Sequence, residues 1–272
     1  MKGKYPAILQ SDKYGKEATK LFNDANDLIE AIIKNKSLTA NAVFGLFPAN
    51  SNGDDIKIYK DESRKSLLTT LHTLRQQNKK ADGQPNLSLA DFIAPEEVGI
   101  NDYIGMFALT AGLGIENLIA KFKKEHDDYN SILVKAIADR LVEAFAEYLH
   151  EMIRKDYWGY CQDEDLTIQN LISEKYTGIR PAPGYPAQPD HTEKLLIFEC
   201  LNAESNVGIK LTESLAMYPA ASVCGLYFSH PEAKYINVGK IGKDQVTDYH
   251  HRKDMSLDEV EKWLQPVLNY DS

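Results

Sequence analysis

The sequence has 272 residues and a formal net charge of −9, and 43% of its residues are hydrophobic. A chain of this length can bury a substantial core, as one large domain or as two small ones. No stretch approaches about eighteen consecutive apolar residues, and the first residues are polar, so neither a membrane span nor a signal peptide is predicted. The acidic balance makes nucleic acid a poor candidate partner.

The three cysteines, Cys161, Cys200 and Cys224, are odd in number and far apart in the sequence. This spacing argues against a disulfide framework, and the absence of any Cys-x-x-Cys pair argues against a zinc finger or ribbon. Free thiols are typical of a reducing compartment. The sequence therefore predicts a cytoplasmic protein.

The first half of the chain alternates between helical and strand-like patterns. Apolar residues recur at helical spacing from Leu21 to Lys34, which predicts a helix. Nearly continuous or alternating apolar runs predict strands, and a polar cluster around Asn52–Gly53 predicts a turn between two of them. In chain order, the other elements predicted here are strands at 42–49 and 56–59, a helix at 63–77, and strands at 89–95 and 102–112.

The second half contains the longest helical pattern, from Asp127 to Lys155. Asp190 with Glu193, and Ser256 with Glu259, have the spacing of helix N-caps. The elements predicted here are helices at 127–155, 167–176, 190–200 and 256–264, and two strands at 221–228 and 234–239 joined by a turn at 229–233.

Strands and helices interleave irregularly, without the regular strand–helix–strand period of a doubly wound sheet. Short turns between paired strands favour antiparallel pairing. We therefore predict an α+β fold, a single domain with a central, mostly antiparallel twisted sheet flanked by helices.

Common catalytic motifs are absent, including the glycine-rich nucleotide loops, the zinc-protease helix and the nucleophile elbow. Glu147, His150 and Glu151 have the spacing of a carboxylate–histidine metal site, but a solvated helix face is favoured and no metal is predicted. Asp139 and Glu143 share one helical face, at a small cost in repulsion. No catalytic residue can be assigned, so the protein either only binds or performs chemistry that needs no protein acid, base or nucleophile.

The segment from Gly178 to Lys194, GIRPAPGYPAQPDHTEK, contains four prolines and two glycines around a single arginine. A solvent loop needs only one or two such residues to turn. The larger number here indicates a surface whose backbone is held in a fixed shape. The segment resembles the signature of the activation domain of cobalamin-dependent methionine synthase, its C-terminal S-adenosylmethionine-binding module. Further segments match this family in order along nearly the whole chain: 45–59, 89–95, 102–114, 126–151, 157–160, 210–235 and 254–264.

The resemblance implies a role in reductive reactivation of methionine synthase. In this family, inactive cob(II)alamin is returned to methylcobalamin by one electron from a flavodoxin-type donor and a methyl group from S-adenosylmethionine. Cobalamin itself supplies the nucleophile, so the protein supplies orientation and electrostatics, which would explain the missing catalytic residues.

The resemblance also implies roles for individual residues. Arg180 would bind the carboxylate of S-adenosylmethionine with its planar guanidinium. Tyr185 and His191 would face the corrin, and Asp139 would receive the histidine released from cobalt. The remaining residues implied are Pro181, Ala182 and Gly184 as backbone contacts, Glu143 and Glu174 as negative charges near the cationic part of the ligand, and Tyr235 and Ile236 as a second contact segment.

The family has a further upstream segment, Asp-Trp-x-Pro-Phe, whose aspartate helps to hold S-adenosylmethionine. The present sequence begins with MKGKYP, so residues 1–272 are expected to be an activation domain that is short at its N-terminus. Cobalamin would be held by a partner module. One alternative is a regulatory or docking module that binds S-adenosylmethionine or a flavodoxin without turnover. Another alternative is a general small-molecule methyltransferase, but the sequence lacks the glycine loop expected of that class.

Overall fold

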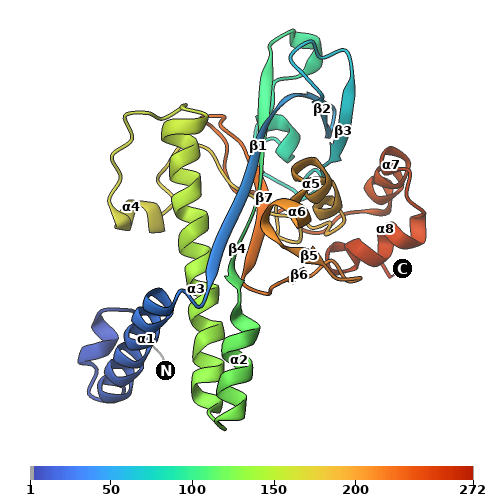
Figure 1. Ribbon diagram of the computed structural model, residues 1–272. Coiled ribbons are helices and arrows are strands. Elements are labelled where there is room, and N and C mark those ends of the chain that lie inside the picture. Colours follow the sequence, from blue (N-terminus) through green and yellow to red (C-terminus); the bar gives the residue numbers. More distant parts are fainter. Residues whose placement is uncertain (1–2, 272) are drawn as a thin grey trace.

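A five-stranded sheet in the order β3-β2-β1-β4-β7 forms the centre of the computed structural model, which describes residues 3–271 (Figure 1). Every pair of neighbouring strands in it is antiparallel, so the predicted α+β fold with an antiparallel sheet is confirmed. The strands are β1 (Thr39–Asn52), β2 (Asp55–Tyr59), β3 (Leu67–His72), β4 (Asp102–Leu113) and β7 (Ser222–Tyr227).

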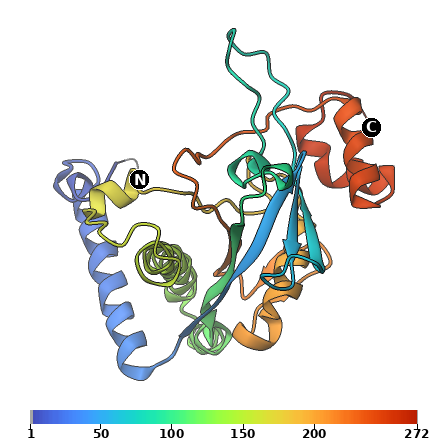
Figure 2. The same cartoon turned by 90° about the horizontal axis from the view of Figure 1, so that it is seen from above.

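The long strand β4 is buried on both faces. Ile104, Met106 and Ala108 belong to one hydrophobic core, and Phe107 and Leu109 belong to a second core on the opposite face. Successive side chains of a strand point to opposite faces, so a continuous apolar run is what a strand between two layers requires. Figure 2 shows the two layers on either side of the sheet.

The first layer contains three helices, α1 (Gly15–Asn35), α2 (Ile115–Lys124) and α3 (Asp128–Met152). The carboxylate of Asp127 caps α3 by accepting from the Asn130 backbone N–H at 2.9 Å. At its C-terminal end α3 continues into one wider turn, η4 (Ile153–Tyr157). The short helices η1 (Ala7–Gln10) and α4 (Ile168–Ile172) lie on the same side (Figure 1).

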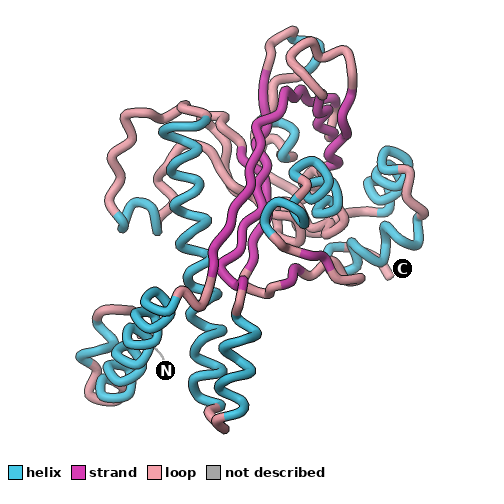
Figure 3. Tube along the Cα trace, in the orientation of Figure 1, coloured by secondary structure: helices cyan, strands magenta, loops and turns pink. Residues whose placement is uncertain are grey.

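The second layer contains α5 (Glu193–Leu201) and α6 (Ala203–Val207), which pack against β1 and β4. Shorter elements on this side are the 3₁₀ turns η2 (Leu89–Phe92) and η3 (Glu96–Val98) and the two-stranded sheet of β5 (Lys210–Leu211) and β6 (Met217–Tyr218). Figure 3 shows how much irregular chain connects these elements.

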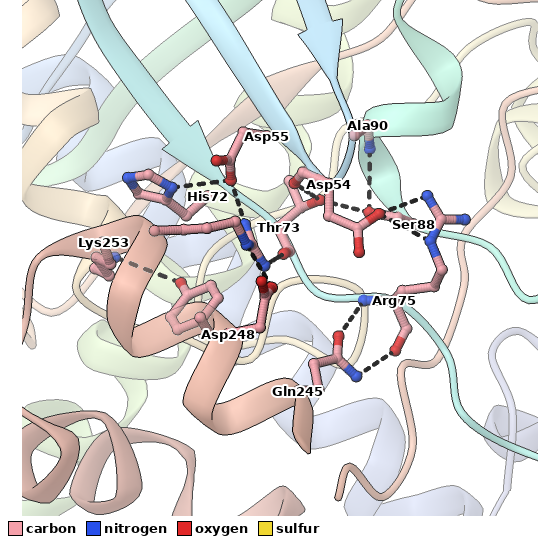
Figure 4. A network of polar contacts seen from close by, with 12 residues as sticks. Asp54, Asp55, His72, Thr73, Arg75, Ser88, Ala90, Gln245, Asp248 and Lys253 are labelled. Atoms are coloured by element: carbon pink, nitrogen blue, oxygen red, sulfur yellow. Dashed lines mark hydrogen bonds and ion pairs between the residues drawn. The ribbon is translucent and has the colours of Figure 1, made fainter. Parts of the chain in front are cut away.

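The C-terminal helices α7 (Lys243–Lys253) and α8 (Leu257–Leu264), followed by η5 (Gln265–Val267), form a small core of their own. A polar network fixes α7 to the hairpin of β2 and β3 (Figure 4). In it, the side-chain amide of Gln245 accepts from the Arg75 backbone N–H at 2.6 Å and donates to the Arg75 carbonyl at 2.9 Å. Ser256 caps α8 as predicted, accepting from the Glu259 N–H at 3.4 Å.

Three predicted elements are wrong. Residues 63–77 do not form a helix, because residues 67–72 pair with β2 instead, and this tertiary pairing overrides local helix propensity. Residues 89–95 contain the turn η2, closed by a capping box of Ser88 and Asp91, rather than a strand. Residues 234–239 are irregular, so the predicted hairpin at 229–233 does not form. The predicted helix 167–176 is shortened to α4.

No helix within residues 3–271 is both long enough and apolar enough to span a bilayer.

Candidate functional site

The proline loop, residues 178–194, runs beside the sheet before it turns into α5. Ile179 exchanges two backbone hydrogen bonds with Phe228, each of 3.0 Å, and the Pro181 carbonyl accepts from Leu226 N–H at 2.9 Å. A tight turn follows, in which the Gly184 N–H donates to the Gln188 carbonyl at 2.7 Å. The loop thus covers the edge of the sheet at β7, and its own hydrogen bonds hold its shape.

A cavity of about 320 Å³ lies between this loop, α3 and the segment around Tyr235. Eight of the eleven residues implied by the family resemblance line it: Glu143, Glu174, Arg180, Pro181, Ala182, Tyr185, Tyr235 and Ile236. Pro186, Ala187 and Val223 complete the lining, and the sequence reasoning missed these three. Val223 is the one half-buried residue of β7, whose other residues are buried, and no pattern in the sequence distinguishes it from them.

Arg180 lines this cavity and is also bound by neighbouring side chains. Its guanidinium forms an ion pair with Glu147 and donates to the hydroxyl of Tyr176 at 3.1 Å. Its backbone N–H donates to the hydroxyl of Tyr235 at 3.1 Å. Arg180 is therefore already partly neutralised, and a ligand carboxylate would have to share the guanidinium with Glu147.

The interpretation of Glu147 and His150 as part of a solvated helix face is wrong. His150 is fully buried, stacked on Tyr227 with ring centroids 5.1 Å apart, and edge-on to Tyr176 at 4.9 Å. Burial, with the neighbouring guanidinium of Arg154, lowers the pKa of His150 well below its ordinary value, so the ring is neutral.

This burial could have been read from the helical spacing. His150 lies on the same stripe as Val142, Ala146, Leu149 and Ile153, all of which are buried. The second carboxylate oxygen of Glu147, Oε2, is also buried, and it has no hydrogen-bond partner within residues 3–271. Across the same described residues, no group of three or more potential ligands could hold a metal ion.

The remaining charges of the cavity are negative. Glu143 and Glu174 are both exposed side chains on its lining, whereas the charge of Arg180 is balanced by Glu147. A cavity with this balance favours a ligand that carries a positive charge, together with a group that can approach the guanidinium.

A second cavity of about 230 Å³ lies on the other side of Tyr185 and Pro186. Gly184 and His191 line this cavity rather than the first. Gly184 has a φ of +93°, and a Cβ there would lie 2.2 Å from Cε1 of His191. The space that glycine leaves open is thus filled by the imidazole, not by a ligand. Asp139 is exposed on α3 and lines neither of the two cavities.

The far end of the loop departs from the predicted N-cap pair of Asp190 and Glu193. Asp190 is buried and accepts from the Thr192 N–H at 2.7 Å, from the Tyr249 hydroxyl at 2.8 Å and from Lys253 Nζ at 2.9 Å. Glu193 is buried and also pairs with Lys253. Both carboxylates therefore bind Lys253 of α7 instead of capping α5. A carboxylate buried without a cation would cost more free energy than an uncapped helix end.

Residues 1–254 match the family model of "Vitamin B12 dependent methionine synthase, activation domain". The chain belongs to this family. A solved structure described as "Crystal Structure of the MetH Reactivation Domain bound to AdoHcy" is 56% identical in sequence and superposes with a TM-score of 0.97, covering 100% of this chain and 83% of that one. This activation domain is therefore part of a cobalamin-dependent methyltransferase, and the resemblance identified from the sequence is confirmed.

Proposed function

We propose that this activation domain binds S-adenosylmethionine in the 320 Å³ cavity and positions its methyl group for transfer to cobalamin during reactivation of methionine synthase. The main observation behind the proposal is the convergence of eight family-implied residues on one cavity, from α3, the segment that follows α4, the proline loop and the segment at 235–236. The similar reactivation domain bound to AdoHcy supports the same ligand class, because AdoHcy is S-adenosylmethionine without its methyl group.

The charges of the cavity suggest how the ligand would lie. Its carboxylate would approach Arg180 and share the guanidinium with Glu147, while its sulfonium and ammonium groups would face Glu143 and Glu174. The backbone of Pro181 and Ala182, with Tyr235 and Ile236, would form the walls. Because the loop holds its shape through its own hydrogen bonds, little conformational entropy would be lost on binding.

The exposed ring of Tyr185 lines both cavities, so it would face the corrin beside the bound ligand. His191, on the far side of Tyr185, would also face the corrin. Asp139, exposed on α3, would receive the histidine released from cobalt.

Cobalamin would be held by the partner cobalamin-binding module and not by this chain. When bound there, that cofactor would supply the nucleophile, and S-adenosylmethionine would give up its methyl group with a neutral thioether as the leaving group. The chain's own residues would need only to bind, orient and exclude water. A flavodoxin-type donor would supply the electron, and the whole cycle would be cytoplasmic.

Isothermal titration tests the binding site through charge. S-adenosylmethionine carries the sulfonium charge that AdoHcy lacks, so the wild-type chain should bind S-adenosylmethionine several-fold more tightly than the Glu143→Gln/Glu174→Gln variant does. AdoHcy affinity should change less, because AdoHcy keeps the ammonium group but lacks the sulfonium charge that the carboxylates also attract. Glu199→Gln, an exposed carboxylate on α5 away from the cavity, is the matched control. Equal losses for both ligands would place the sulfonium elsewhere.

Turnover is tested separately, in the complete multidomain protein with a one-electron reductant and S-adenosylmethionine. Loss of the cob(II)alamin absorbance is expected. Binding of S-adenosylmethionine without this loss would instead support the regulatory or docking module.

A further inference from the structure

His191 is held on two sides by the fold. Its ring lies directly over the Cα of Gly184, where a Cβ would approach within 2.2 Å of Cε1. On another side the indole of Trp263, from α8, lies with its centroid 6.3 Å from the imidazole centroid. The orientation of the imidazole is therefore fixed before any ligand arrives.

One turn further along, Lys194 contacts the same ring. Its side chain is buried, with 7% relative exposure, and Nζ donates to the Leu215 carbonyl at 2.9 Å. The same Nζ lies 3.0 Å from Nδ1 of His191. An ammonium group has three donors and no acceptor, so Nδ1 must accept, and the proton of a neutral imidazole must be on Nε2.

The imidazole is neutral under ordinary conditions. Burial, and then the charge of Lys194, lower the pKa of His191 below its ordinary value, and the nearby Asp190 opposes them only in part. Within residues 3–271, Nε2 has no hydrogen-bond partner and is not a buried atom. This N–H is therefore available to the second cavity.

The other side chains that line the second cavity are uncharged. Besides His191, its polar side-chain groups are the indole of Trp263, the hydroxyl of Tyr185 and the amide of Asn237, whose oxygen already accepts from Gly239 N–H at 2.9 Å. Prolines and Val267 form the rest of its lining, together with Gly184. A lining with several N–H and O–H donors, and without a lysine, arginine or carboxylate, suits a neutral oxygen acceptor better than a phosphate or an ammonium.

We propose that Lys194 is a positioning residue that holds His191 as the Nε2–H tautomer, so that the second cavity receives a neutral carbonyl oxygen from the edge of the incoming corrin. A corrin ring carries carboxamide side chains around its edge, and these have such an oxygen. The identity of this acceptor rests on the proposed function, whereas the tautomer of His191 does not.

Histidine-selective ¹⁵N NMR of the 272-residue chain tests the tautomer directly. The chain has seven histidines, and His191→Gln identifies the resonance of interest. In the wild type, Nδ1 of His191 should have the chemical shift of an unprotonated acceptor. In Lys194→Met this preference should be lost, while Lys194→Arg should preserve it, because a donor is retained.

Thr192→Val is the matched control, since it perturbs the same turn and leaves Lys194 in place. It should leave the His191 tautomer unchanged. A proton on Nδ1 in the wild type, or the same spectrum in Lys194→Met and wild type, would overturn the proposal. The wild-type spectrum decides this point even if Lys194→Met does not fold.

The second measurement is reactivation in the complete multidomain protein. At saturating S-adenosylmethionine, Lys194→Met should slow the loss of cob(II)alamin several-fold, while its affinity for S-adenosylmethionine stays within twofold of wild type. A changed tautomer with an unchanged rate would overturn the role in corrin binding. If the wild-type protein itself fails to methylate cobalamin, the proposed function fails, and the tautomer result still stands by itself.

Discussion

Each end of the proline loop is held by an ion pair. The two ion pairs differ in how far their charged atoms are buried and hydrogen-bonded. At the open end, Arg180 lines the 320 Å³ cavity and pairs with Glu147, whose side chain is 32% exposed. At the closed end, Lys253 pairs with both Asp190 and Glu193, and all three side chains are at most 10% exposed.

The difference is clearest in the hydrogen bonds. At the closed end, Asp190 accepts from a backbone N–H, two hydroxyls and an ammonium. At the open end, Oε2 of Glu147 is buried and has no partner within residues 3–271. Buried polar groups are nearly always hydrogen-bonded, so a buried carboxylate oxygen without a partner marks a place where another group can bind. We infer that the closed end anchors the loop and that the open end belongs to the binding site.

The largest expected effect is at the closed end. Lys253→Met should lower the free energy of unfolding by about 3–5 kcal/mol, because it leaves two carboxylates buried without their cation. Denaturant unfolding of the wild type and of Lys262→Met, an exposed lysine on α8, provides the comparison. A loss below about 1 kcal/mol would mean that the closed end behaves like a surface ion pair.

The pH dependence of this loss supplies a second check. Burial raises the pKa of Asp190, but the charge of Lys253 outweighs burial, so the net pKa is lowered. The stability contributed by Asp190 is therefore present above its unfolded pKa of about 3.9, and it is lost as pH falls through the folded value. In Lys253→Met the cation is gone while burial and the hydrogen bonds from Thr192 and Tyr249 remain, so the two carboxyls should protonate more easily, and the variant should approach wild type as the pH falls.

At the open end, the expected effect is on binding. Arg180→Ala should weaken S-adenosylmethionine binding by about 1.5–3 kcal/mol, the scale of hydrogen bonds to a charged group. Arg180→Lys should recover only part of this loss, because an ammonium cannot reproduce the bidentate geometry. Titration calorimetry measures both, and unchanged affinity in both variants would remove Arg180 from the site.

Much of the fold could be predicted from local patterns. The buried strand at 102–112 and the long helix from Asp127 were predicted because their hydrophobic periods are long and unambiguous. Residues 67–72 were misassigned because their strand exists only through pairing with β2, which local sequence does not reveal. The segment at 234–239 was misassigned for the opposite reason: an alternating pattern was present, but no neighbouring strand pairs with it.

The site was predictable to a similar degree. The family resemblance implied the residues that line the first cavity, but it gave no indication of the groups behind them. Glu147 was interpreted as solvated because its partner, Arg180, is 33 residues away in the sequence and reaches it only through the folded loop. The same holds for Asp190, whose spacing to Glu193 suggested a cap, whereas Lys253 lies on another helix.

A smaller effect is expected in the middle of the loop, between the two ends. Gly184→Ala should cost about 1–3 kcal/mol of stability, because it combines an unfavourable φ of +93° with a clash against His191. Gly83→Ala is a matched control: it has a φ of +81° but nothing within 4 Å of the new Cβ. Thermal unfolding should therefore show the larger loss for Gly184→Ala, and equal losses would mean that the imidazole moves aside freely.

The smallest expected effect returns to the closed end. The Thr192 hydroxyl donates to both oxygens of Asp190, at 2.8 Å each. Thr192→Val removes this donor at nearly constant shape and should cost about 1 kcal/mol of stability, while Thr192→Ser, which keeps the hydroxyl, should cost less. Neither variant should change the affinity for S-adenosylmethionine, since Thr192 does not line the cavity. A clear loss of affinity in Thr192→Val, measured beside Thr192→Ser, would show that the two ends are coupled through the rigid loop, and the closed end would then have to be counted as part of the site.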